Sequence, residues 1–307
     1  MTPAIHLGHV SKSYGQAQAV SDVTLTANVG EVLGFLGPNG AGKTTTIRLL
    51  MGFLWPTIGT IRLLGQDMAD PAQAQIARRR LGFVPDVAGL DPAATGTRLL
   101  DDLAALQREP PVDRDTLVEA LELRPADLHR PLGRLSRGTR QKINLVQGLQ
   151  HRPDLLILDE PTEALDPLAK LALFDLLQTA RERGATIFFS SHVLSEVEEL
   201  CDRVALIRAG KLVAVEQMAA LRTRLARRVT LTLADVRPSV REQLAALPTV
   251  ADLVEDGVTW RFSTTMLPSL LTFLADLPVV DLLIEPPSLE QVFLRYYANE
   301  ESQWEQR

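Results

Sequence analysis

The sequence lacks several features that mark particular classes of protein. Its one cysteine, Cys201, excludes an internal disulfide and fits a reducing compartment. It has no apolar run near the roughly 20 residues that span a bilayer, and residues 1–8 lack the basic flank and apolar stretch of a secretory signal. Lysine and arginine number 32 against 38 aspartate and glutamate, so the basic excess of a nucleic-acid binder is missing. We therefore expect a cytoplasmic chain that has no membrane span and does not bind nucleic acid.

The composition is that of a globular protein, with 46% hydrophobic and 23% charged residues. Up to about residue 215, short apolar runs typical of buried strands alternate with helical segments, as in a layered α/β domain. These runs are Val32–Leu36, Leu81–Val84, Leu155–Leu158, Ala185–Phe189 and Val204–Ile207. Leucines at helical spacing between residues 91 and 150 predict a helical subdomain, over about 87–150, inserted into this frame.

A second unit is predicted after residue 218. Strand-like and helix-like segments follow one another in the order β-α-β-β-α-β, at 229–233, 240–247, 250–253, 258–262, 267–274 and 279–284. Asp256-Gly257 lies between the strand-like segments 250–253 and 258–262 and is a hairpin signal. The order is that of a ferredoxin-like unit. We therefore predict two domains, 1–218 and 219–307, the second a small α+β accessory domain.

One glycine-rich segment carries the strongest chemical signal. Residues 37–44 satisfy the pattern G-x-x-x-x-G-K-[ST] of a P-loop, or Walker A motif, after a buried strand and before a helix. Backbone amides in such a loop surround a phosphate, the lysine reaches the outer phosphates, and the hydroxyl that follows binds Mg²⁺. A glycine-rich turn without a ligand is the alternative, but the strand and helix around it favour a nucleotide site. The predicted nucleotide contacts here are Gly37, Pro38, Asn39, Gly40, Ala41, Gly42, Lys43, Thr44 and Thr45.

Two consecutive acids end the apolar run 155–158. Asp159 is placed to hold Mg²⁺, usually through water, and Glu160 to polarise the attacking water as a general base. Acids after a strand can instead cap the next helix, but the P-loop favours the catalytic interpretation. The chain lacks the N-K-x-D motif with which a GTPase recognises its base.

Several motifs together resemble those of one family. Residues 135–141, Leu-Ser-Arg-Gly-Thr-Arg-Gln, resemble the signature L-S-x-G-x-x-Q of ABC-type ATPases. Tyr14 resembles the aromatic residue that stacks on adenine, residues 163–166 resemble the D-loop, and His192 resembles the switch histidine. The resemblance covers Ile5 to about Val215. We therefore identify this part as similar to a P-loop NTPase cassette of the ABC type, with a mixed-sheet core and a helical subdomain.

The resemblance implies an Mg-dependent ATPase that binds ATP between two cassettes. Ser136 and Gly138 would begin a helix that faces the P-loop of the second cassette, and Asp166 of the D-loop is a further predicted nucleotide contact. Because the chain has one P-loop and one signature, it would pair with a copy of itself or with a related chain. The implied catalytic residues are Lys43, Glu160 and His192.

The chain departs from the family pattern at two positions. Asp86 stands where the family usually has a glutamine that touches Mg²⁺ and relays contact with the membrane partner. A carboxylate can still bind the metal, so Asp86 is a predicted metal contact together with Thr44 and Asp159. Arg137 replaces the first of two usual glycines in the signature. Neither departure removes the P-loop lysine or the two acids, and hydrolysis is therefore predicted to be intact.

Residues near the end of the sequence resemble those of one branch of the family. Residues 287–294, Pro-Ser-Leu-Glu-Gln-Val-Phe-Leu, resemble the P-S-L-E-x-x-F-L tail of type 2 ABC exporters, and the same stretch predicts an amphipathic closing helix over 288–297. The resemblance implies integral membrane permease partners and a peripheral location on the inner face of the cell membrane. The alternatives are a regulatory ABC ATPase and one that acts on ribosomes or nucleic acid, although the acidic balance argues against the second.

Overall fold

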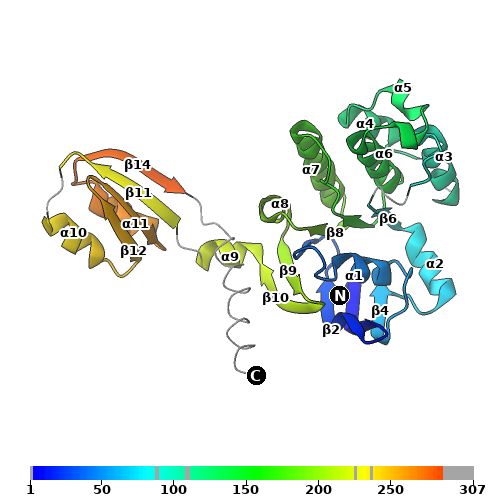
Figure 1. The fold of residues 1–307 in the computed structure, drawn as a ribbon, viewed down its shortest axis with the longest axis horizontal. Helices are drawn as coiled ribbons and strands as arrows, with labels where there is room; N and C mark the ends of the chain where they lie inside the picture. The colour runs from blue at the N-terminus through cyan, green and yellow to red at the C-terminus, as the bar shows by residue number, and fades with distance from the viewer. Residues whose placement is uncertain (1–2, 87–89, 108–110, 225–226, 236–237, 286–307) are drawn as a thin grey trace. The chain divides into compact units, whose positions relative to one another are not determined.

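The computed structural model describes residues 3–86, 90–107, 111–224, 227–235 and 238–285. The chain divides into two compact units, Met1–Glu216 and Gln217–Arg307 (Figure 1). Among the helices described, none is both long enough and apolar enough to cross a membrane.

The first unit is built on a six-stranded sheet with the order β10-β9-β3-β8-β7-β6. Its strands are β3 (Val32–Leu36), β6 (Leu81–Val84), β7 (Leu155–Asp159), β8 (Thr186–Ser191), β9 (Arg203–Arg208) and β10 (Lys211–Gln217). In this sheet, the neighbouring strands β9, β3, β8, β7 and β6 run parallel to one another. Because β3, β7 and β8 are buried along their whole length, they read as continuous apolar runs in the sequence. The strands predicted from those runs are confirmed.

A second, antiparallel sheet has the order β2-β1-β4-β5. It contains β1 (Ile5–Tyr14), β2 (Ala17–Ala27), β4 (Ile58–Leu63) and β5 (Gln66–Asp67), and α2 (Pro71–Arg79) follows it. Helix α1 (Lys43–Leu50) buries Ile47, Leu49 and Leu50 in one core with side chains of both sheets. The helix that follows the phosphate loop is therefore fixed from two sides.

The predicted helical subdomain is present between β6 and β7. It consists of α3 (Gly96–Gln107), α4 (Arg114–Ala120), α5 (Pro125–Leu128), a short 3-10 helix (Leu132–Arg134) and α6 (Arg137–Leu149). Figure 1 shows α3 to α6 gathered at the β6 end of the sheet, where α6 packs on β6. The rest of this unit contains α7 (Pro167–Glu182) and α8 (Leu194–Leu200).

The second unit opens with α9 (Met218–Arg224) and then has the predicted β-α-β-β-α-β order. The elements are β11 (Arg227–Leu233), α10 (Pro238–Ala245), β12 (Val250–Asp256), β13 (Thr259–Thr264), α11 (Leu267–Leu274) and β14 (Val279–Glu285). Its antiparallel sheet has the order β12-β13-β11-β14 around a core that includes Trp260 and Phe262. This is a ferredoxin-like arrangement. The predicted closing helix at 288–297 and the P-S-L-E tail lie outside the described residues.

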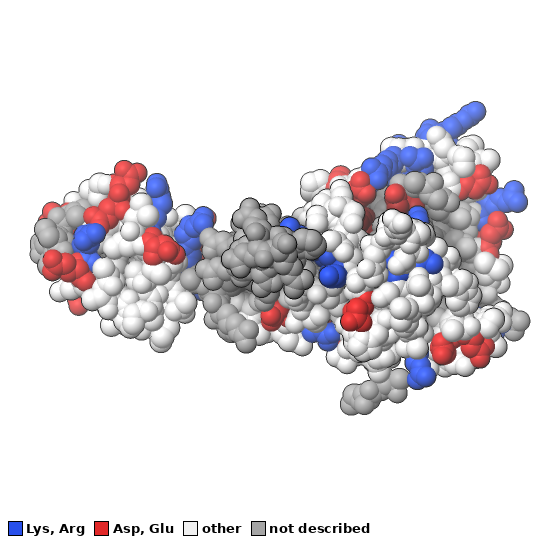
Figure 2. All heavy atoms as spheres, turned by 60° about the horizontal axis from the view of Figure 1, so that its bottom comes forward, with Lys and Arg blue, Asp and Glu red and all other residues white. Residues whose placement is uncertain are grey.

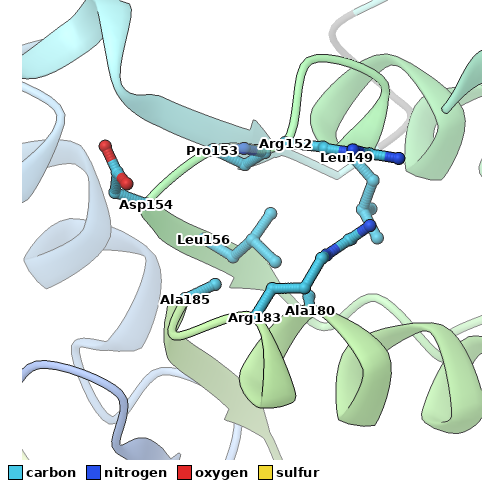
Figure 3. Close-up of a pocket in the computed structure, with 8 residues that line it drawn as sticks. All are labelled: Leu149, Arg152, Pro153, Asp154, Leu156, Ala180, Arg183 and Ala185. Atoms are coloured by element: carbon cyan, nitrogen blue, oxygen red, sulfur yellow. The ribbon is translucent and has the colours of Figure 1, made fainter. Parts of the chain in front are cut away.

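Asp113, just before α4, joins the helical subdomain to the α/β core. Its carboxylate accepts hydrogen bonds from Arg152 Nε at 2.9 Å and from Arg183 Nη1 at 2.8 Å. Both arginines line a cavity of about 210 Å³, together with Leu149 and Leu156 (Figure 3). The Arg152 guanidinium lowers the pKa of Asp113, against the opposing effect of burial, and Arg183 adds to the lowering. A carboxylate that is 8% exposed is thus kept charged by two cations.

We expect Asp113→Asn to lower the free energy of unfolding by roughly 1–3 kcal/mol at pH 7, because it weakens charge-assisted hydrogen bonds from two arginines. Because the folded pKa lies below the unfolded one, this stabilisation is present above about pH 4 and is lost as the pH falls further. Urea unfolding followed by circular dichroism measures both effects. Asp102→Asn, at an exposed carboxylate 3.5 Å from Arg98, is the matched control. Equal losses in the two variants would contradict the role given to Asp113.

Candidate functional site

The phosphate loop lies between β3 and α1 and lines a cavity. Gly42 caps α1 with φ 107°, and a Cβ there would lie 2.8 Å from the carbonyl oxygen of Ala19. Only glycine fits this position without strain. The cavity has a volume of about 310 Å³. The predicted residues that line it are Asn39, Gly40, Gly42, Lys43, Thr44, Thr45 and Glu160.

Lys43, the first residue of α1, is buried to 4% exposure. Its ammonium group donates to the carbonyl oxygens of Gly37 at 2.7 Å and Pro38 at 3.2 Å, and lies 3.1 Å from Glu160 Oε1. A buried charge must be paired in this way. The cation therefore sits within the loop, at a helix N-terminus, where phosphate oxygens are favoured.

The two acids at the end of β7 share one serine of the neighbouring strand. Asp159 is directly opposite Ser190 of β8. The Ser190 hydroxyl donates to Asp159 Oδ1 at 2.8 Å and accepts from the backbone N–H of Glu160 at 3.0 Å. Glu160 has φ 48°, an uncommon conformation for a residue other than glycine. Such strain often accompanies function, because surrounding contacts must hold it in place.

Asp159 is 6% exposed, and its burial raises its pKa above the ordinary value. The negative charge of Glu160 acts in the same direction, whereas the hydroxyls of Ser190 and Thr44 and the charge of Lys43 oppose it. A carboxylate in this position gains from a nearby cation, because the cation favours its charged form.

Glu160 contacts both Lys43 and the predicted switch histidine, His192. Its Oε2 atom lies 2.8 Å from Nδ1 of His192, which follows β8, while Oε1 faces Lys43. His192 is 46% exposed and Glu160 is 22% exposed. The structure thus brings the three predicted catalytic residues into direct contact, with the base candidate between the cation and the imidazole.

The predicted metal contacts Asp159 and Thr44 supply a carboxylate and a hydroxyl that are hydrogen-bonded to each other. Within the described residues, no group of three or more His, Cys, Asp and Glu side chains could hold a metal ion. Mg²⁺ is commonly bound by one or two carboxylates, waters and the phosphates of a substrate, not by an all-protein cage. The donors present therefore fit Mg²⁺ only in company with a phosphate ligand.

The predicted signature residues lie at the start of α6. Ser136 is the N-cap, and its hydroxyl accepts from the backbone N–H of Thr139 at 3.0 Å. A Cβ on Gly138 would lie 2.7 Å from the carbonyl oxygen of Ala164, so this turn packs closely on the D-loop. Gln141 is buried and donates to the carbonyl oxygen of Pro161 at 2.7 Å.

Three further predicted residues are Asp86, Asp166 and Tyr14. Asp86 lies 3.8 Å from Nη2 of Arg137. Asp166 caps α7 by accepting from the N–H of Ala169 at 2.9 Å, and this bond lowers its pKa. The ring of half-exposed Tyr14 lies 5.4 Å from the ammonium of Lys12, and Tyr14 does not line the cavity.

Some residues of the site carry no motif that sequence reasoning could have used. Gln18, Ala19, Ala209 and Gly210 form part of the cavity wall because β2 and the β9–β10 turn come near the loop. Glu196 of α8 is 4% exposed and accepts from Ser191 at 2.7 Å and from Thr162 at 2.9 Å. The two serines at 190–191, which end an otherwise mainly apolar strand, were the sequence feature that could have indicated a polar contact here.

The chain is similar to a large group of known proteins. A family model described as "ABC transporter" matches residues 20–163. Nod factor export ATP-binding protein I of Rhizobium johnstonii is 33% identical over 303 residues, which are 97% of this chain and 96% of that protein. Bacitracin transport ATP-binding protein BcrA of Bacillus licheniformis is 36% identical over 216 residues, 69% of each chain.

Solved structures agree with this similarity. The structure of an ATP-binding subunit of an ABC transporter has a TM-score of 0.66 and 28% identity, and the match covers 72% of this chain and 92% of that one. A dimeric ATP-binding cassette in a post-hydrolysis state, bound to ADP and Pi, has a TM-score of 0.63 and 23% identity over 70% of this chain and 98% of its own. The second supports the fold alone.

We expect Ser190→Ala to raise the pKa of Asp159 further, because it removes a hydrogen bond that stabilises the ionised carboxylate. It should also lower the free energy of unfolding by about 1–3 kcal/mol, since the N–H of Glu160 loses its partner. Carbon-detected NMR titration of labelled aspartate measures the first effect. Ser190→Thr keeps the hydroxyl and is the control. A pKa that stays constant or falls in Ser190→Ala would contradict the assignment.

Proposed function

Because the chain belongs to the family of ABC transporter ATP-binding proteins, we propose that it is the ATP-hydrolysing subunit of an exporter and drives a separate membrane permease. One relative that matches through both units is named for Nod factor export, and another is named for bacitracin transport. The observation that carries the catalytic part of the proposal is the position of Glu160, between Lys43 and His192 and beside Asp159.

The triphosphate of ATP would occupy the cavity of the phosphate loop. The backbone of residues 37–42, with Lys43, Thr44 and Thr45, would bind its oxygens, and Tyr14 would stack on the adenine. Mg²⁺ would be held by Thr44 and Asp159, with Asp86 as a further contact, and when bound it would neutralise charge on the β- and γ-phosphates. The fit rests on the carboxylate and hydroxyl donors already in contact at this point.

Glu160 would act as the general base. Its carboxylate is partly exposed on the cavity, so it can accept a proton from the water that attacks the γ-phosphate. His192 would hydrogen-bond the γ-phosphate and, through its contact with Glu160, keep the carboxylate oriented. Lys43 would turn from Glu160 to the phosphate and leave the base free to accept the proton.

Two chains would close around two ATP molecules. The sequence has one P-loop and one signature, so the hydroxyl of Ser136, the backbone at Gly138 and the D-loop residue Asp166 would face the nucleotide held by the other subunit. The start of α6 is suited to that role, because the positive end of a helix dipole lies there. We propose a homodimer or a pair of related chains.

The permease would bring this chain to the inner face of the cell membrane, as a peripheral subunit on the cytoplasmic side. On the face drawn in Figure 2, positive and negative side chains are interspersed and do not form a continuous basic surface. That distribution agrees with the net charge of −6 and favours a protein partner over a nucleic-acid backbone.

We expect Glu160→Gln to slow the hydrolysis of Mg-ATP by roughly 10²–10⁴, because an amide cannot accept the proton. ATP binding should persist, since the phosphate loop is unchanged, and an ATP-bound dimer should accumulate. Steady-state phosphate release and light scattering measure the two effects. Glu182→Gln, at the exposed end of α7, is the control and should hydrolyse at the normal rate. Normal turnover in Glu160→Gln would contradict the assignment of Glu160 as the general base.

A further inference from the structure

Arg137 contacts two carboxylates that belong to different segments. Its Nη2 atom lies 2.9 Å from Oε1 of Glu163, in the turn after β7, and 3.8 Å from Oδ1 of Asp86, in the segment after β6. Arg137 itself is the first residue of α6, directly after the N-cap Ser136. One guanidinium thus connects the beginning of the signature helix to both segments.

The contact lies at the end of a polar seam along α6. Gln141 donates to Pro161 after β7, Asn144 donates to the carbonyl oxygen of Pro85 at 2.6 Å, and Gln147 donates to that of Phe83. Gln147 also donates to Asn144 at 3.1 Å. The interior of α6 is therefore hydrogen-bonded to the backbone of β6 and of the two segments, after β6 and after β7, whose carboxylates contact Arg137.

The two departures from the family pattern are in contact with each other. A carboxylate at 86 in place of a glutamine adds negative charge, and a guanidinium at 137 in place of a glycine adds positive charge beside it. The side chains of Arg137, Glu163 and Asp86 are 48%, 43% and 57% exposed. Exposed ion pairs of this kind contribute little to stability.

We propose that Arg137 is a positioning residue for ATP hydrolysis, which holds Asp86 and Glu163 at the start of α6 and compensates the carboxylate at 86. The inference rests on the proposed function. Without Arg137, the two carboxylates would lose a shared counter-charge. The turn that carries Glu163 is the continuation of the strand that ends in Asp159, so its displacement would reach the base Glu160.

The test is a set of full-length variants assayed for kcat and KM with Mg-ATP. In the wild-type background, Arg137→Ala should lower kcat by roughly three- to thirtyfold. KM should change little, because the phosphate loop is untouched. In a background that carries Asp86→Gln and Glu163→Gln, adding Arg137→Ala should lower kcat by less than about twofold, because the guanidinium has no carboxylate left to hold at either position.

Controls separate this role from others. Arg137→Lys keeps the charge and should recover part of the loss, whereas Arg98→Ala removes an exposed arginine from α3 and should leave kcat unchanged. If Arg137→Ala lowers kcat equally in both backgrounds, Arg137 acts on the nucleotide or the fold directly and the proposal is overturned. An unchanged kcat in Arg137→Ala overturns it as well. Wild-type chain that hydrolyses no ATP would instead be a failure of the proposed function.

Discussion

The ion pair between Lys43 and Glu160 is the contact on which the site depends. The Lys43 side chain is 4% exposed, and a cation so far from water needs a partner. Glu160 is that partner here, and its second oxygen binds His192 at 2.8 Å. A triphosphate in the cavity would compete for Lys43, so its arrival would change the surroundings of the Glu160 carboxylate and of the His192 imidazole together. Under the proposed function, this carboxylate would therefore link nucleotide binding to hydrolysis.

The strand order creates that linkage. Because β8 lies between β3 and β7, the carboxyl ends of three parallel strands place the phosphate loop, the two acids and His192 along one edge. Ser190 holds Asp159 and the backbone of Glu160 in register across two of those strands. The polar side chains along α6 then join the signature helix, and with it the helical subdomain, to the segments after β6 and β7.

Local patterns predicted much of this architecture. The buried parallel strands β3 and β7 carry runs of apolar residues, and the elements of the second unit show strand-like or helix-like periodicity, so both could be predicted from the sequence. The strands of the antiparallel sheet in the first unit, β1, β2, β4 and β5, were not predicted from the sequence. Contacts such as Arg137 with Asp86, or Asp113 with Arg183, join residues far apart in sequence, and no local pattern encodes them. The structure brings Lys43, Glu160 and His192 into contact, but the roles of the predicted site residues stay predictions.

The transporter account is tested most directly by the partners of the chain. Tagged full-length protein would be purified with Mg-ATP from gently solubilised native cells, and the proteins that accompany it would be identified by mass spectrometry. The account predicts a membrane protein with several spanning segments, in an amount comparable to that of the chain itself. Ribosomal proteins or nucleic acid in its place, with no membrane protein, would contradict the account.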